Sequence, residues 1–189
     1  NIHRDFYNDL NIPIIGSIKN GGLAEAGDTL WLDEKTLLIG RGFRTNFEGI
    51  EQIREILSPQ GISIHIFDLP VYSGETACLH LMSLISLVDT YTALVCLPLL
   101  PVGLLELLKE KNFLIIEAPF GEFENSNTLS TNVLATGPKA CIMLDSMPET
   151  RAVLEREGIN VKVFKGDSLC IGCEGGPTCL TRPLLRSHT

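Results

Sequence analysis

The sequence is short of positive charge, with 15 Lys and Arg against 23 Asp and Glu in 189 residues and a formal net charge of −8. A nucleic-acid groove needs a basic face, so this balance argues against a nucleic-acid partner. The sequence also lacks the run of roughly 20 uncharged apolar residues that spans a bilayer, so no membrane partner is expected. The longest apolar run, residues 93–108, is broken by Pro98, Pro101 and Gly103. It is predicted to be a buried strand that leads into a helix.

Residues 1–9 also lack the basic flank and the apolar core of a signal peptide, so this segment is not expected to be one. Residue 1 is Asn rather than Met, and we expect the sequence to begin inside a longer natural chain. The six cysteines lie among apolar residues without the spacing of a disulfide-rich scaffold. They are therefore predicted to be reduced thiols in a cytoplasmic protein. The proportions of 44% hydrophobic and 20% charged residues are typical of a globular domain.

What the sequence does contain is a unit of secondary structure that recurs about every fifty residues. Each unit consists of a short apolar strand, a helix with apolar residues on one face, and a second strand. Another candidate strand precedes each unit, which makes the repeat strand–strand–helix–strand. The predicted elements are 29–32, 36–40, 46–57 and 62–68 in the first unit, 79–86, 93–97, 102–111 and 113–119 in the second, and 132–136, 140–145, 148–157 and 161–164 in the third.

The helix starts fit capping chemistry, with Asn46 placed to cap the first helix and Pro101 and Pro148 near the starts of the others. Regular spacing of such units favours an α/β array around an axis. In such an array the first strands crowd the centre, and residues at their ends converge on one pocket. A single α/β sheet with alternating elements remains the alternative.

Two polar motifs lie around the first unit. In LAEAGD, Glu25 and Asp28 are separated only by the small Ala26 and Gly27, which indicates a backbone that another group approaches closely. The spacing alone favours a solvated surface turn. In RGFRTN, Arg44 lies between a strand and a helix start and has the chemistry to hold a carboxylate in a bidentate pair. A solvated arginine is the more common arrangement there.

Two further candidates lie later in the chain. His80 is in the middle of the predicted apolar strand 79–86, where a satisfied core histidine is the more common arrangement. A tight Gly-Gly-Pro loop comes directly before Cys179, and such a loop exposes backbone N–H groups and presents a thiol. Zinc held by Cys170, Cys173 and Cys179 is the competing interpretation, because Cys170 and Cys173 have the spacing of a zinc knuckle. No second pair follows them, however, and His188 is the only nearby imidazole.

Four segments in this order, LAEAGD, GRGFRTN, CLHLMS and GGPTCLTRPL, resemble the amidinotransferase and dimethylarginine dimethylaminohydrolase family, which includes arginine deiminases. The resemblance extends from about residue 10 to residue 186. It implies the pentein fold, a five-bladed α/β propeller of strand–strand–helix–strand units, of which this chain has about three blades. The blades are expected at about 22–70, 71–120 and 121–168, with a closing segment at 169–189, in a single, N-terminally incomplete domain 1–189.

The resemblance also implies roles for five residues. Cys179 corresponds to the nucleophile, His80 to its acid–base partner, and Glu25 to the acidic residue that orients the histidine. Arg44 corresponds to the arginine that binds a substrate carboxylate, and Asp28 is expected to bind substrate with it. The implied substrate is a small guanidino compound, with no metal or cofactor, and a homo-oligomer is left open.

Two departures from the family pattern shape the expected activity. Met82 stands where deiminases and glycine amidinotransferases carry an aspartate that grips the guanidinium. This favours a dimethylargininase-like hydrolase. A second guanidinium-binding aspartate lies upstream in the family, and Asp5 and Asp9 are too close to Glu25 to match it. An amidinotransferase and a non-catalytic propeller that serves as a binding module are the alternatives.

Overall fold

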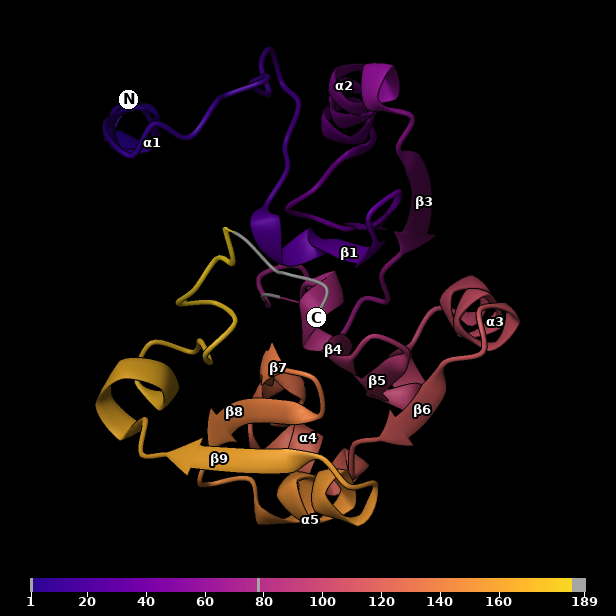
Figure 1. The fold of residues 1–189 in the computed structure, drawn as a ribbon, viewed down its shortest axis with the longest axis vertical. Helices are drawn as coiled ribbons and strands as arrows, with labels where there is room; N and C mark the ends of the chain where they lie inside the picture. The colour runs from indigo at the N-terminus through magenta and orange to yellow at the C-terminus, as the bar shows by residue number, and fades with distance from the viewer. Residues whose placement is uncertain (1, 78, 185–189) are drawn as a thin grey trace.

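The strands of the protein form three separate three-stranded sheets in a computed structural model that describes residues 2–77 and 79–184 (Figure 1). In each sheet an antiparallel hairpin is followed, through a helix, by a third strand parallel to the second. The first sheet and its helix comprise β1 (Thr29–Asp33), β2 (Thr36–Arg41), α2 (Phe47–Leu57) and β3 (Ser63–Asp68).

The same order of elements returns twice. The second unit comprises β4 (Ile85–Asp89), β5 (Thr92–Val95), α3 (Val102–Glu110) and β6 (Leu114–Glu117). The third comprises β7 (Leu134–Gly137), β8 (Ala140–Leu144), α5 (Pro148–Arg156) and β9 (Asn160–Phe164). The predicted repeat of strand–strand–helix–strand units is therefore confirmed, and the alternative of one continuous sheet is wrong.

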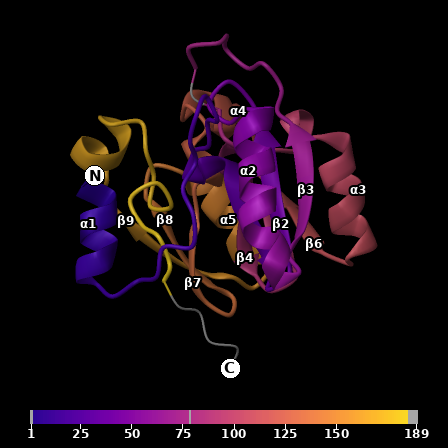
Figure 2. The same ribbon diagram turned by 90° about the horizontal axis from the view of Figure 1, so that it is seen from above.

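The three units are arranged around a common centre, with β1, β4 and β7 on the inside and α2, α3 and α5 on the outside (Figure 1). The inner strand β4 contacts β7, and β1 contacts the short turn that precedes β4. Helix α1 (Ile2–Asp9) and the C-terminal segment lie on the remaining side, between the first and third sheets (Figures 1 and 2).

Apolar side chains between neighbouring blades form the core. One cluster joins the first and second units through fully buried residues such as Leu38, Leu81 and Ile85. Another joins the second and third units through residues such as Leu94 and Met143. Each blade therefore buries its inner faces against its neighbour, and burial of this kind is the main stabilising contribution to the fold.

The local signals at the helix starts act as predicted. The Asn46 side chain accepts a hydrogen bond from Gly49 N at 2.8 Å and so caps α2. Pro148 occupies the first turn of α5, where its missing N–H leaves no helical hydrogen bond unmade.

The predicted strand 79–86 is wrong in its first half. Leu81–Ser83 forms a 3₁₀ turn, η3, and β4 begins only at Ile85. Ser83 closes the turn, because its N–H donates to His80 O at 3.0 Å and its hydroxyl accepts from His80 N at 3.2 Å. His80 is therefore at the start of a turn and not in the middle of a strand.

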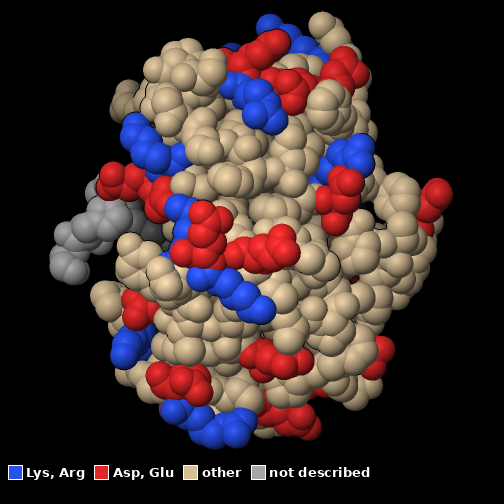
Figure 3. All heavy atoms as spheres, turned by 90° about the vertical axis from the view of Figure 1, so that its right-hand side faces the viewer, with Lys and Arg blue, Asp and Glu red and all other residues tan. Residues whose placement is uncertain are grey.

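Several other short elements were not predicted. They include α4 (Phe120–Asn125), the 3₁₀ turn η5 (Leu129–Thr131) and the π-helical turn η6 (Asp167–Ile171). On the face seen in Figure 3, acidic and basic side chains are interspersed. In the part of the chain that the structure describes, no helix has the length and apolar character needed to cross a membrane.

Candidate active site

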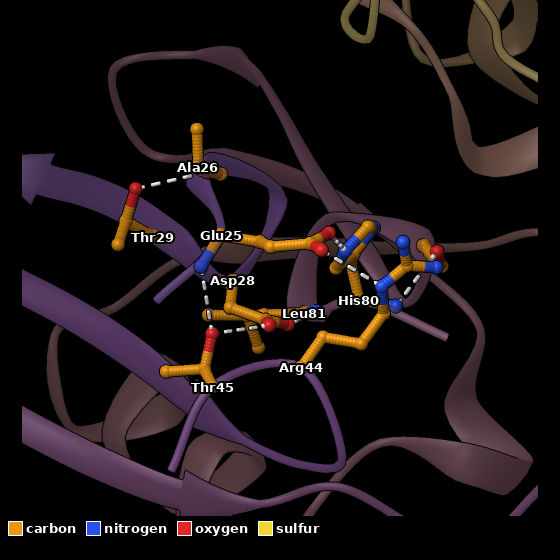
Figure 4. A network of polar contacts seen from close by, with 9 residues as sticks. Glu25, Ala26, Asp28, Thr29, Arg44, Thr45, His80 and Leu81 are labelled. Atoms are coloured by element: carbon orange, nitrogen blue, oxygen red, sulfur yellow. Dashed lines mark hydrogen bonds and ion pairs between the residues drawn. The ribbon is translucent and has the colours of Figure 1, made fainter. Parts of the chain in front are cut away.

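The carboxylate of Asp28 brings three of the four sequence motifs together (Figure 4). Thr45 Oγ1 donates to Asp28 Oδ2 at 2.6 Å, and Leu81 N donates to Asp28 Oδ1 at 3.0 Å. The Thr45 hydroxyl also accepts a hydrogen bond from Glu25 N at 3.0 Å. Burial raises the pKa of Asp28, and the hydrogen bond from Thr45 opposes this effect. Asp28 is 1% exposed, and its buried carboxylate links the three motifs through these hydrogen bonds.

Glu25 lies between two of the predicted functional residues. Its Oε2 is 2.7 Å from His80 Nε2, and its Oε1 accepts a hydrogen bond from Arg44 Nε at 2.9 Å (Figure 4). Burial acts to raise the pKa of Glu25, but the hydrogen bonds from His80 and Arg44 outweigh it and lower the pKa. Glu25 is therefore ionised at neutral pH, and its carboxylate lies within hydrogen-bond distance of the imidazole.

Gly27 explains why small residues separate Glu25 from Asp28. A Cβ at Gly27 would lie 2.7 Å from Cγ and Nδ1 of His80, closer than real contacts allow. The backbone of the LAEAGD segment is therefore approached closely, as its composition indicates, and the approaching group is the imidazole. The interpretation as a solvated surface turn is wrong for this segment.

A cavity of about 350 Å³ opens beside Arg44. It lies between the segment after β2 and the segment that leads from β3 to His80. Apolar and aromatic side chains form much of its wall, together with an ion pair between Arg41 and Asp68. Its lining includes Phe43, Arg44, Phe47, Val71, Tyr72 and Leu79. The guanidinium of Arg44 thus contacts Glu25 and also borders a space large enough for a small ligand.

Cys179 is held on a different part of the framework. Its thiol is exposed and free, and its Sγ accepts a hydrogen bond from Asn132 Nδ2 at 3.1 Å. Asn132 lies between η5 and β7, at the inner end of the third blade. The structure thus joins Glu25, Arg44 and His80 in direct contact and attaches Cys179 to a neighbouring blade.

Three of the other cysteines are buried, unlike Cys179. Burial raises the pKa of Cys96 to about 11 and that of Cys141 to about 11. Cys170 is also buried, and burial raises the pKa of its thiol. Cys173 is exposed, and Cys78 lies outside the described residues. Within residues 2–77 and 79–184, no three His, Cys, Asp or Glu side chains are grouped to hold a metal.

Direct substrate binding by Asp28 remains a prediction that this geometry does not favour, because protein groups occupy both carboxylate oxygens. The sequence did not single out Thr45 or Asn132. Thr45 follows Arg44 directly in the RTN motif, so its position in that motif could have identified it as a candidate. Asn132 had no comparable signal, because its partners Thr178 and Cys179 lie 46 and 47 residues away.

Gly27→Ala is expected to lower the free energy of unfolding by about 1–3 kcal/mol, because the new methyl group overlaps the imidazole of His80. Gly121→Ala is the matched control, since Gly121 lies in α4 with open space where its Cβ would be. That change should be neutral or slightly stabilising. Urea unfolding of both variants measures the difference, and equal stabilities would contradict the close approach.

No protein-family profile matches the chain. An arginine deiminase from Listeria welshimeri is 27% identical over 220 residues, an alignment that covers 98% of this chain and 53% of that protein. The chain spans about half the length of the curated relatives it matches.

Solved structures resemble the fold over most of the chain. A dimethylarginine dimethylaminohydrolase from Pseudomonas aeruginosa in complex with citrulline is 25% identical, with a TM-score of 0.65 over 86% of this chain and 56% of that one. The amidinotransferase SxtG from Microseira wollei is 21% identical, with a TM-score of 0.69 over 87% and 48%. The N-terminal domain of the cyanobacterial arginine dihydrolase ArgZ is 18% identical, with a TM-score of 0.74 over 98% and 66%. With its three blades around a common centre, the chain has the α/β-propeller fold of the pentein enzymes.

Proposed function

We propose that this protein hydrolyses a C–N bond of a small guanidino compound such as arginine or a methylated arginine, with Cys179 as nucleophile. The observation that carries the proposal is the 2.7 Å contact between Glu25 and His80, because it presents an oriented imidazole on the framework that also bears an exposed cysteine. The likeness to the dimethylarginine dimethylaminohydrolase and to the arginine dihydrolase ArgZ supports the same class of reaction.

The first step is attack of the Cys179 thiolate on the guanidinium carbon. This carbon is delocalised and a poor electrophile, so a thiolate attacks it more readily than neutral water does. The carbon–sulfur bond forms, and the tetrahedral intermediate then loses an amine. His80 donates the proton that the departing amine needs. The product of this step is a thiouronium in which the amidino carbon is bound to Cys179 Sγ.

The second step is hydrolysis of the thiouronium. His80, now neutral, removes a proton from the attacking water, and the thiolate of Cys179 leaves as the second tetrahedral intermediate collapses. The guanidine is thereby converted into a urea. Glu25 stabilises the protonated imidazole that donates in the first step and that forms again in the second, in the manner of the acidic member of a catalytic triad.

The substrate is proposed to carry a carboxylate that Arg44 binds in the cavity of about 350 Å³. Arginine guanidinium is suited to this role because it pairs with a carboxylate through two hydrogen bonds. Met82, an uncharged residue in η3, favours a dimethylargininase-like hydrolase over a deiminase that grips the guanidinium with an aspartate. The reaction is placed in the cytoplasm in this proposal, since the cysteines of the described chain are free thiols.

The proposal is tested by incubating the whole protein with arginine or with dimethylarginine, in the presence and absence of glycine. A hydrolase forms citrulline from either substrate, whether or not glycine is present. An amidinotransferase instead forms guanidinoacetate and ornithine from arginine and glycine. The likeness to an amidinotransferase structure supports this second activity as the runner-up. Failure to convert any of these substrates would favour the non-catalytic binding module.

Arg44→Ala is expected to raise KM by about 10- to 100-fold, the usual effect of losing a hydrogen-bonded charge on the substrate. The control is Arg54→Ala, which removes an exposed arginine that pairs with Glu51 within α2. Steady-state kinetics measure KM of both variants. KM should rise in Arg44→Ala and stay at the parent value in Arg54→Ala. A fall in kcat at unchanged KM would mean that Arg44 acts solely through Glu25 and does not hold the substrate.

A further inference from the structure

Asn132 binds the loop that carries Cys179 through both ends of its side-chain amide. Its Nδ2 donates to Cys179 Sγ at 3.1 Å. Its Oδ1 accepts from Thr178 N at 2.9 Å and from Thr178 Oγ1 at 2.7 Å. Asn132 is 6% exposed, so these bonds are shielded from competition with water. The amide is thus buried and is engaged at both its nitrogen and its oxygen by two consecutive residues of the loop.

The loop is shaped to receive this amide. A Cβ on Gly176 would lie 2.4 Å from Cγ of Asn132, so only glycine lets the loop pack this closely. Cys179 N donates to Gly176 O at 3.1 Å, which closes a turn over the amide group. Gly176 itself is buried, although the thiol that follows is exposed. The position of the sulfur is therefore set by Asn132 together with this turn.

Asn132 is in turn connected to the segment that begins at His80. It directly follows Thr131, whose Oγ1 donates to Ser83 O at 2.6 Å. The Thr131 carbonyl accepts from Ser86 Oγ at 2.6 Å. Ser83 closes the turn that His80 begins. A continuous path of hydrogen bonds and covalent links therefore runs from the backbone of His80 to the residue that holds the sulfur.

We propose that Asn132 is a positioning residue for Cys179, which holds the sulfur relative to His80 and stabilises its thiolate through the amide N–H. This inference rests on the proposed function for its catalytic meaning. A thiolate accepts a hydrogen bond more strongly than a thiol does, so the Asn132 donor favours the nucleophilic form. The titratable groups close to this thiol include Cys170 and Cys173 of the same segment, neither of which supplies a positive charge.

The discriminating variant is Asn132→Asp. It has the same shape and keeps an oxygen to accept from Thr178, but it replaces the N–H donor with a second oxygen and adds a negative charge that also disfavours a thiolate. Asn132→Leu has a similar shape and removes the donor without adding charge, so slower alkylation in both variants assigns the effect to the lost N–H. Alkylation of Cys179 by iodoacetamide should become about tenfold slower at neutral pH, and its pH profile should move to higher pH. Peptide mapping measures this rate against that of Cys173, an exposed cysteine in the same segment. Asn160→Asp makes the same chemical change at an exposed position in the third sheet and should leave both rates unaltered.

Turnover gives the second readout. In the whole protein, Asn132→Asp should lower kcat by about tenfold or more and leave KM nearly unchanged, because the lost interaction involves the nucleophile and not the bound substrate. An unshifted alkylation profile for Cys179 in a folded Asn132→Asp variant would overturn the inference. A shifted profile in a protein that converts no guanidino substrate would support the role of Asn132 at the thiol and count against the proposed function alone.

Discussion

Replacing Cys179 with serine should reduce turnover to below about 1% of the parent value, the largest effect expected of any single change in this chain. The proposed reaction needs a nucleophile that is negatively charged at neutral pH, and a serine hydroxyl without an activating base does not meet this need. The variant should fold normally, because the thiol is exposed and a serine fits where a cysteine does. Circular dichroism and thermal unfolding check the fold, and product formation from arginine or dimethylarginine checks the chemistry.

Cys173→Ser is the matched control for this change, since Cys173 is the other exposed thiol of the C-terminal segment. Its activity should stay close to that of the parent. In limited alkylation of the parent protein, Cys179 should be labelled before the buried Cys96 and Cys141, and substrate should protect it. Activity above about 1% in folded Cys179→Ser would refute nucleophilic catalysis by this residue and leave the fold assignment intact.

His80→Gln should lower kcat by about 10²- to 10⁴-fold, the usual contribution of a positioned acid–base group. Glutamine keeps a donor that can reach Glu25, so the local hydrogen bonding is largely preserved while proton transfer is lost. The loss should appear in kcat and in kcat/KM alike, because the proton moves only in the chemical steps.

The control for His80 is His65→Gln. His65 lies on β3 and contacts Ser63 Oγ at 3.3 Å, remote from the LAEAGD motif in sequence and in hydrogen bonding. Its substitution should change kcat by no more than about twofold, as expected for a surface change. If His80→Gln kept parental kcat, the imidazole would have no part in proton transfer and its contact with Glu25 would be structural only.

The sequence determined the repeat and the elements that compose it. Hydrophobic periodicity, the Asn46 cap and the prolines near the helix starts are signals carried within a few neighbouring residues. They predicted three strand–strand–helix–strand units, and the structure has three such units. The predicted strand 79–86 was wrong because a side chain forms a turn there. The Ser83 hydroxyl accepts a hydrogen bond from His80 N, and apolar periodicity does not show that this bond replaces a strand pairing.

The sequence also supplied the candidate residues, but it did not fix how they meet. Spacing alone favoured a solvated turn for Glu25 and Asp28 and a core position for His80. The structure instead buries Asp28 beneath the site and places Glu25 against His80 and Arg44. The tertiary structure therefore decided that Asp28 is a buried support and that Glu25 contacts His80 and Arg44 directly.

The physical reason is the distance along the chain over which each interaction acts. Capping and periodicity join residues three or four positions apart, so they can be read from a short segment. The contact of His80 with Glu25 spans 55 residues, and that of Asn132 with Cys179 spans 47. Each joins side chains carried by different parts of the fold, so each depends on tertiary packing that a short segment does not contain.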